Sequence, residues 1–409
     1  PEQIVATMVE GAQVNFDTAT RIESRYFVEL ARGNVAKNMI NTFWFQLNQI
    51  KAGNSRPTTN EQYKVQRVGV LGAGMMGAGI AYSCAIKGLP VVLKDVDIGR
   101  AQKGKDYSRR LLEKQCNKGR KTAQQVEQIL SLITVTGNAT DLAECDLVIE
   151  AVFENREVKA TVTRETEAVL GETAIFASNT SALPITELAE ASARPQNFIG
   201  MHFFSPAEKM PLVEIITGEQ TSDVALAWAF DLAQKLGKKP IVVKDAPGFF
   251  TTRVIGQTIT QGQRMLAEGV NPALIENGAA FNGSPMGPLE TLDTISLETA
   301  YHAANQRKAD AEARGETLEP SAESEVIRIM VEEVKRVGQA KGAGFYDYDG
   351  NGKKIKTWPG LKDLFAAQGY CDIPYQDVKD RLLFSRVLEA SRIMEEGTLT
   401  SVADGNIGS

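Results

Sequence analysis

The chain has 409 residues, of which 43% are hydrophobic and 23% charged, and its formal net charge is −6. This composition argues against a disordered chain, and the length exceeds what one core usually supports, which favours two or three domains. Because Asp and Glu outnumber Lys and Arg, 51 to 45, the excess of positive charge that nucleic-acid binding requires is missing, and we expect no nucleic-acid partner.

The cysteines and histidines argue against a disulfide-bonded protein and against a metalloprotein. Cys84, Cys116, Cys145 and Cys371 are far apart in the sequence and form no CxxC pair, which favours a reduced, cytoplasmic setting. With 2 histidines, and no ligand spacing among the Cys, Asp and Glu residues, we expect no bound metal. The sequence has no apolar run of about 18 residues and no signal-peptide pattern, so we expect neither a membrane span nor secretion.

Residues 1–62 form the first predicted segment. Apolar side chains recur at helical spacing between Ile22 and Ile50, without a strand pattern, which predicts a helical leader. The polar stretch from Ala52 to Pro57 interrupts this periodicity and is typical of a linker. We therefore place a boundary between residues 62 and 63.

Residues 63–246 have the pattern of an α/β domain. Short runs rich in Val and Ile alternate with longer amphipathic stretches, which predicts crossover units and a mostly parallel sheet. The runs cover residues 68–71, 91–93, 147–152, 174–177, 198–204 and 241–243.

A glycine-rich turn follows the first of these runs and opens a helix of small residues. In this GxGxxG pattern Gly72 permits a tight turn, Gly74 lets the backbone approach a pyrophosphate, and Gly77 allows the helix to pack closely on the strand. Asp95 ends the second strand, where a carboxylate that binds the ribose hydroxyls belongs. These features predict a Rossmann domain that binds NAD rather than NADP, although Lys94 weakens that preference. The alternatives are an ordinary glycine turn and a solvated strand-end aspartate.

A candidate acid–base pair lies in the later part of this domain. His202 is the one imidazole of the predicted α/β domain and stands in an apolar run. The alternative interpretation is a histidine that is simply packed in the core. Glu214 is flanked by apolar residues, and a buried carboxylate needs a partner. His202 paired with Glu214 suits the oxidation of an alcohol, because the hydroxyl proton must pass to a base as the hydride leaves. Ser181 can hold the substrate oxygen.

The remaining residues are predicted to be all-helical, with one domain over 247–348 and a second helical repeat over 349–409. The segment from Arg264 to Gly278 recurs 128 residues later, between Arg392 and Gly405, which indicates two related helical units. The second copy stops before a counterpart of the loop that follows the first, so we expect it to be truncated. The alternative is a frayed native terminus.

Five motifs in matched order resemble the 3-hydroxyacyl-CoA dehydrogenase family, and the resemblance extends from about residue 5 to the end of the chain. They are Gly72–Gly77 (GAGMMG), Ile149–Asn155 (IEAVFEN), Ser178–Ser181 (SNTS), Met201–Pro206 (MHFFSP) and Pro285–Pro288 (PMGP). The resemblance implies NAD-dependent oxidation of an (S)-3-hydroxyacyl-CoA to the 3-ketoacyl-CoA in fatty acid β-oxidation.

The resemblance also implies roles for particular residues. His202 and Glu214 would be catalytic, and Ser181 would lie near the nicotinamide and the substrate oxygen. The further residues that would contact NAD are Met76, Asp95, Val152, Phe153, Glu154 and Lys159.

Two expected substrate contacts depart from the commoner family pattern. Ser205 stands where many relatives have Asn, a change that is familiar in one branch of the family. Thr252 stands where an Asn normally contacts the substrate and supports the catalytic centre. A threonine hydroxyl still donates one hydrogen bond, but it is shorter and lacks the second donor of an amide. We therefore expect turnover that is retained but reduced.

The partners implied by the resemblance are an acyl-CoA thioester as substrate and, in the full-length complex, a thiolase beta subunit. The leader resembles the last helices of the enoyl-CoA hydratase half of multifunctional relatives, and we expect no hydratase activity because the hydratase core is absent. Two alternatives stay open: a scaffold fragment that binds NAD and acyl-CoA with little activity, and a dehydrogenase of small free hydroxy acids. The latter would be expected to use a lysine, and none lies between Gly248 and Gly256.

Overall fold

The computed structural model describes residues 2–59, 65–313, 315, 317 and 319–409. They form two compact units, one made of residues 1–249 together with 397–409 and one made of residues 250–396. The predicted boundary at residues 62 and 63 lies outside the described residues. Within the part of the chain that is described, no helix combines the length and the apolar character that crossing a membrane requires.

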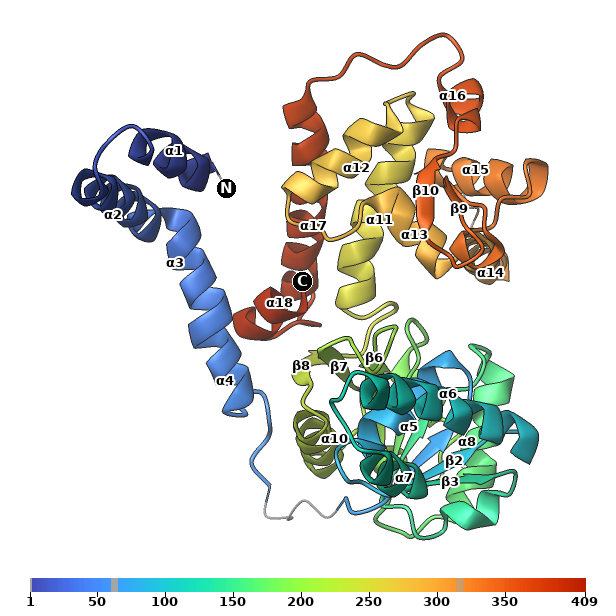
Figure 1. Cartoon of the computed structure of the whole chain (residues 1–409). Coiled ribbons are helices and arrows are strands. Elements are labelled where there is room, and N and C mark those ends of the chain that lie inside the picture. The colour runs from blue at the N-terminus through green and yellow to red at the C-terminus, as the bar shows by residue number, and fades with distance from the viewer. Residues whose placement is uncertain (1, 60–64, 314, 316, 318) are drawn as a thin grey trace. The chain divides into compact units, whose positions relative to one another are not determined.

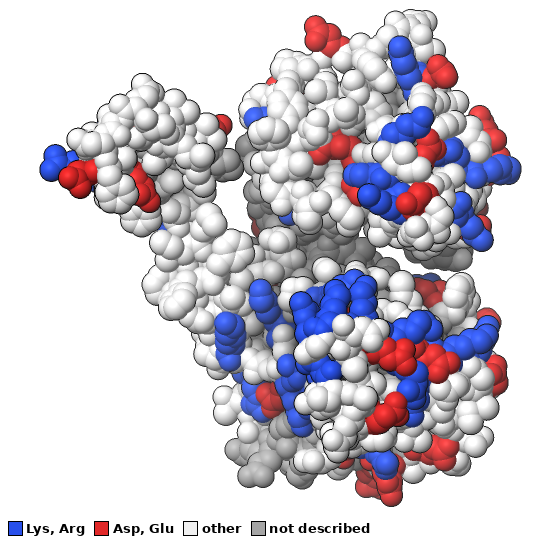
Figure 2. All heavy atoms as spheres, viewed as in Figure 1, with Lys and Arg blue, Asp and Glu red and all other residues white. Residues whose placement is uncertain are grey.

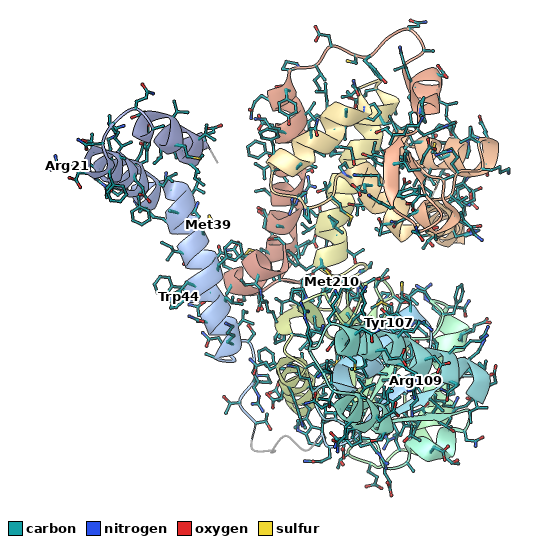
Figure 3. The ribbon with its side chains drawn as sticks, viewed as in Figure 1. Arg21, Met39, Trp44, Tyr107, Arg109 and Met210 are labelled. Atoms are coloured by element: carbon teal, nitrogen blue, oxygen red, sulfur yellow. The ribbon has the colours of Figure 1, made fainter. Side chains whose placement is uncertain are left out.

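The leader in the first unit is a run of helices (Figure 1). Its carboxyl end packs on the rest of the unit, since Ile50 is buried and its carbonyl accepts a hydrogen bond from Gln234 Nε2 at 3.2 Å. Farther toward the amino end the apolar side chains are exposed, and Figure 3 shows Met39 and Trp44 projecting from the leader. The elements are α1 (Glu2–Gly11), α2 (Phe16–Arg32), α3 (Asn34–Ile40), the π-helical η1 (Asn41–Gln46) and α4 (Leu47–Lys51).

The central feature of the first unit is an eight-stranded sheet with the strand order β3-β2-β1-β4-β5-β6-β7-β8. All neighbouring strands pair in parallel except β6 and β7, which are antiparallel. The strands are β1 (Val68–Leu71), β2 (Val91–Lys94), β3 (Ile133–Thr136), β4 (Leu147–Glu150), β5 (Ile175–Ser178), β6 (Phe198–Phe203), β7 (Leu212–Thr217) and β8 (Lys239–Lys244). The mostly parallel α/β sheet predicted from the sequence is therefore confirmed.

Several helices of this unit begin at side-chain caps that the sequence supplies. Asp97 accepts a hydrogen bond from the Arg100 N–H at the start of α6, and Asn155 accepts one from the Val158 N–H at the start of α8. The elements between the strands are α5 (Met75–Ala85), α6 (Ile98–Asn117), α7 (Ala123–Ser131), η2 (Ala139–Leu142), α8 (Arg156–Glu167), α9 (Ile185–Ala189), η3 (Pro195–Asn197) and α10 (Asp223–Lys235). Side chains of α5 and α10 share one apolar core with the strands.

The second unit is mainly helical and has its own apolar core, which includes Met265, Leu289 and Phe345. Its helices are α11 (Thr251–Ala267), α12 (Pro272–Phe281), α13 (Pro288–Ile295), α14 (Leu297–Ala313), α15 (Ala322–Arg328), η4 (Ile329–Glu333), η5 (Gln339–Lys341), α16 (Gly360–Phe365) and α17 (Tyr375–Glu395). The last helix of the chain, α18 (Val402–Gly408), belongs to the first unit.

The prediction of an all-helical region after residue 247 was incomplete, because β9 (Tyr346–Tyr348) and β10 (Lys354–Thr357) form an antiparallel hairpin there. The buried carboxylate of Asp293, at the end of α13, holds this hairpin. It accepts hydrogen bonds from the N–H groups of Phe345 (2.8 Å) and Tyr346 (3.0 Å) and from the Tyr348 hydroxyl (2.8 Å). Burial outweighs these bonds and raises the pKa of Asp293 to about 6.

The two copies of the repeated segment adopt the same local structure. In the first copy α11 ends at Ala267, Gly269 has φ +84° and α12 follows. In the second copy α17 ends at Glu395, Gly397 has φ +75° and α18 follows. A positive φ favours glycine just after a helix, so the shared glycine explains why α11 and α17 end at corresponding positions of the repeat.

Candidate active site

The turn after β1 leaves room for a phosphate group at the start of α5. Gly72 has φ +89°, and a Cβ there would lie 2.6 Å from the Ala151 carbonyl oxygen, while a Cβ at Gly77 would lie 1.8 Å from that of Gly72. A Cβ at Gly74, in contrast, would meet nothing within 4 Å. Gly74 precedes the first residue of α5 and supplies no side-chain cap, so the first N–H groups of that helix have no capping side chain as a partner. This arrangement fits the pyrophosphate of a dinucleotide.

Asp95 directly follows β2 and is fixed by the same turn. Its Oδ2 atom accepts a hydrogen bond from the Ala73 N–H at 2.7 Å, and its Oδ1 atom accepts one from the Val96 N–H, also at 2.7 Å. The guanidinium of Arg100 lies 3.9 Å from Oδ1. A carboxylate held in this way beside the glycine turn is placed to accept hydrogen bonds from ribose hydroxyls.

His202 and Glu214 are paired, as the burial argument anticipated. They lie directly opposite each other on the antiparallel strands β6 and β7, and His202 Nδ1 is 3.0 Å from Glu214 Oε2. Glu214 is 0% exposed and His202 is 6% exposed. A carboxylate can only accept at this contact, so Nδ1 carries the shared proton, and in the neutral ring the lone pair is then on Nε2. Nε2 makes no hydrogen bond to any residue that the structure describes.

Ser181 lies in the loop after β5. Hydrogen bonds connect this loop to the loop after β4 on one side and to β6 on the other. The Ser181 N–H donates to Glu154 Oε1 at 3.1 Å. Two residues earlier, Asn179 Oδ1 accepts a hydrogen bond from the Phe203 N–H at 2.8 Å, so this loop is tied to the end of the strand that carries His202. Ser181 itself is exposed.

The loop after β4 carries the other predicted NAD contacts. Phe153 is 79% exposed, and the side chain of Glu154 is partly exposed. Lys159, in contrast, is 2% exposed and forms ion pairs with Glu150 at 2.9 Å and Glu154 at 3.1 Å. Val152 donates its N–H to Glu150 Oε1 at 2.8 Å.

Sequence reasoning missed Glu150, the last residue of β4, which is 1% exposed. Its carboxylate binds the Lys159 ammonium and also accepts a hydrogen bond from Ser178 Oγ at 2.7 Å. The sequence does carry a signal for its burial, because Glu150 lies inside the apolar run of residues 147–152. A buried carboxylate needs a partner, which is the same reasoning that pairs Glu214 with His202.

The remaining predicted residues lie in three places. Met76 is in the first turn of α5, and Ser205 is exposed in the loop after β6, with its Oγ atom 3.7 Å from Met75 Sδ. Thr252 is the second residue of α11 and belongs to the second unit, whereas the other predicted site residues belong to the first.

The predicted site residues of the first unit gather at one edge of the sheet. The glycine turn, Asp95, Glu154 and Ser181 follow the carboxyl ends of β1, β2, β4 and β5, and His202 lies near that end of β6. In parallel sheets this is the edge at which ligands bind, beside the point where the strand order reverses. That point lies here between β1 and β4, since β2 and β3 extend to one side and β5 to the other. Among the residues that the structure describes, no group of three or more His, Cys, Asp or Glu is arranged to hold a metal ion.

Two family models match the chain in succession. Residues 67–246 match the NAD binding domain of 3-hydroxyacyl-CoA dehydrogenase, and residues 248–348 match its C-terminal domain. The chain belongs to the 3-hydroxyacyl-CoA dehydrogenase family.

Several members of this family are similar over most of the chain. It is 36% identical over 414 residues to the fatty acid oxidation complex subunit alpha of Pseudomonas savastanoi, a match that covers 100% of the chain and 56% of the relative. The chain thus spans a little over half the length of the curated relatives it matches.

Two solved structures extend the comparison. The (S)-3-hydroxybutyryl-CoA dehydrogenase of Ralstonia eutropha is 36% identical, with a TM-score of 0.63, over 70% of this chain and 100% of that one. The 3-hydroxybutyryl-CoA dehydrogenase of Escherichia coli is 25% identical, with a TM-score of 0.70, over 83% and 87% of the two chains.

Proposed function

We propose that the protein oxidises the 3-hydroxyl of an (S)-3-hydroxyacyl-CoA to the 3-ketoacyl-CoA with NAD, as a step of fatty acid β-oxidation. The observation that carries this proposal is the buried pair of His202 and Glu214 at the carboxyl edge of a dinucleotide-binding sheet. An imidazole oriented by a carboxylate is the group that alcohol oxidation at neutral pH requires.

His202 and Glu214 have different roles in the transfer of the hydroxyl proton. His202 Nε2 accepts the hydroxyl proton, and Glu214 holds Nδ1–H in place and stabilises the imidazolium that forms. The Ser181 hydroxyl holds the substrate oxygen in line with Nε2. NAD, when bound, supplies the acceptor for the hydride from the third carbon of the substrate.

The preference for NAD rests on Asp95. Its carboxylate is fixed by two backbone N–H groups, so it would repel a 2′-phosphate and accept hydrogen bonds from free ribose hydroxyls. The guanidinium of Arg100, 3.9 Å away, neutralises part of this charge and weakens the preference for NAD over NADP. The variant Asp95→Asn measures how strong that preference is.

A coenzyme A thioester as substrate is supported by the names of the solved relatives and by the charge on α6 and the residues that follow it. Coenzyme A carries several phosphate charges, which Lys and Arg attract. Figure 2 shows Lys and Arg gathered on the sheet domain where α6 and α7 face the viewer. Between residues 98 and 121 the basic side chains are Arg100, Lys103, Lys105, Arg109, Arg110, Lys114, Lys118, Arg120 and Lys121, against the acidic Asp106 and Glu113.

The second candidate function is a scaffold that binds NAD and acyl-CoA with little turnover. Thr252 favours it, because it stands at the second position of α11 where the family resemblance implies an Asn. We further propose a thiolase beta subunit as partner, since the curated relatives are alpha subunits of a complex. A pull-down with that subunit tests this association.

The deciding experiment follows the absorbance of NADH while the pure protein reduces acetoacetyl-CoA. We expect turnover by the wild type and its loss in His202→Gln, with NADH affinity unchanged in the variant. Tight NADH binding without turnover by the wild type would support the scaffold instead. Equal rates for the wild type and His202→Gln would contradict the proposed chemistry.

A further inference from the structure

We propose that Glu150 is a positioning residue of the dehydrogenase, acting through Lys159 on the loop that carries Ser181. The inference rests on the proposed function, because it assigns the purpose of this contact to the same site. Glu150 is not one of the residues that the family motifs single out as a contact of NAD or substrate, and its role follows from its burial and its hydrogen bonds.

The carboxylate of Glu150 is almost inaccessible to solvent and fully engaged. Both of its oxygens lie 2.9 Å from Lys159 Nζ, Oε1 also accepts from the Val152 N–H, and Oε2 also accepts from Ser178 Oγ. A charge so deeply buried is tolerated only when it is paired and hydrogen-bonded. Removing it therefore disturbs all three partners at once.

Lys159 connects Glu150 to Glu154, at the carboxyl edge of the sheet. Its ammonium, in the first turn of α8, lies between the buried Glu150 and the partly exposed Glu154. The Glu154 atom Oε2 takes the ion pair, and Oε1 accepts the hydrogen bonds from the Ser181 N–H and the Thr180 hydroxyl. The buried carboxylate is thus connected, one contact at a time, to the backbone of Ser181.

The same network joins the ends of three adjacent strands. Glu150 ends β4 and binds the side chain of Ser178, which ends β5. In the loop that follows, the Asn179 side chain accepts from the N–H of Phe203, the residue after His202. The loop fixed by Glu150 on one side is therefore fixed to the catalytic strand on the other.

Loss of the Glu150 charge should move Glu154 and the Ser181 loop in a predictable direction. Lys159 would retain one carboxylate, that of Glu154, and would attract it more strongly. Glu154 would then be drawn away from the N–H of Ser181, and the loop would shift. A displacement of about 1 Å at a reacting group lowers rates by about 100-fold.

The test uses Glu150→Gln in the full chain, with Glu167→Gln as matched control. Glu167 is a buried carboxylate at the other end of α8, where it accepts hydrogen bonds from Ser192 Oγ and the Ala193 N–H. Both variants should lower stability to urea. Only Glu150→Gln should lower kcat for acetoacetyl-CoA reduction, by about 10- to 100-fold, and only Glu150→Gln should raise the Kd for NADH measured by fluorescence, by about tenfold.

A double-mutant cycle separates positioning from general damage. If Glu150 acts through Ser181, then Glu150→Gln should lower kcat less than about threefold in a Ser181→Ala background, because residues of one network are not additive. The milder Ser178→Ala, which removes one hydrogen bond from Glu150 and no charge, should reduce kcat by a few-fold and serves if Glu150→Gln does not fold.

Two results would overturn the inference. One is equal changes in kcat and NADH affinity for Glu150→Gln and Glu167→Gln, and the other is an effect of Glu150→Gln that is fully additive with Ser181→Ala. An inactive wild type would instead refute the proposed function, and the comparison of NADH affinities would still decide whether Glu150 positions the cofactor loop.

Discussion

The substitution Glu214→Gln tests the central pair with little change of shape. Glutamine can still accept the hydrogen bond from His202 Nδ1, but it cannot stabilise a positive imidazole by charge. At the observed separation of 3.0 Å and an effective dielectric constant of about 20, the attraction between imidazolium and carboxylate is about 5.5 kcal/mol. This energy corresponds to a rate factor of about 10⁴, which is also the order of magnitude for disabling the orienting carboxylate of a catalytic triad.

We therefore expect kcat for acetoacetyl-CoA reduction to fall by about 10³- to 10⁴-fold in Glu214→Gln. The Kd for NADH and the urea midpoint serve as controls, and the former should stay within twofold of the wild type. A fall of less than about tenfold in a folded variant with normal NADH binding would refute the reasoning, because the pair would then be only a buried structural contact.

Three further substitutions test other parts of the structure. Asp95→Asn removes the charge that repels a 2′-phosphate, so the ratio of kcat/KM for NAD to that for NADP should fall by about tenfold; an unchanged ratio would rule out Asp95 as the determinant. Thr252→Asn should raise kcat by up to about 100-fold, and an unchanged rate would remove Thr252 as a cause of reduced turnover. Asp293 has a folded-state pKa of about 6 against an ordinary value of 3.8, so the folded protein binds more protons between these values. Its stabilising contribution is complete below about pH 4 and is lost as the pH rises through about 6, a change of about 3 kcal/mol. Exchange of the Phe345 and Tyr346 amide hydrogens should report this loss, and it should be absent in Asp293→Asn.

The sequence predicts the local geometry of the candidate site best where the residues concerned are neighbours in the chain. The strand, the glycine turn and Asp95 occur in a fixed order over a short stretch, so their geometry follows from neighbours in the chain. The pairing of His202 with Glu214 was inferred from the energetic penalty of burying an unpaired carboxylate, although the run that carries Glu214 was not recognised as a strand.

What the sequence did not predict depends on contacts between distant segments. The strand β3 has only four residues, with partly exposed positions, and gives a weak pattern. The hairpin of β9 and β10 is held by Asp293, 52 residues before Phe345, and nothing within the hairpin shows that contact. The burial of Glu150 could have been inferred from its apolar run, but its partners Lys159 and Ser178 come from a helix and another strand, and the sequence does not show those contacts.

The antiparallel register of β6 and β7 links the proposed chemistry of His202 and Glu214 to correct folding. Because side chains alternate between the two faces of a sheet, a slip of one residue between these strands would place the imidazole and the carboxylate on opposite faces. A misregistered molecule would keep most of its secondary structure and lose the proposed dehydrogenase activity. Specific activity, measured per molecule during refolding, would therefore report when the central strands have reached their correct alignment.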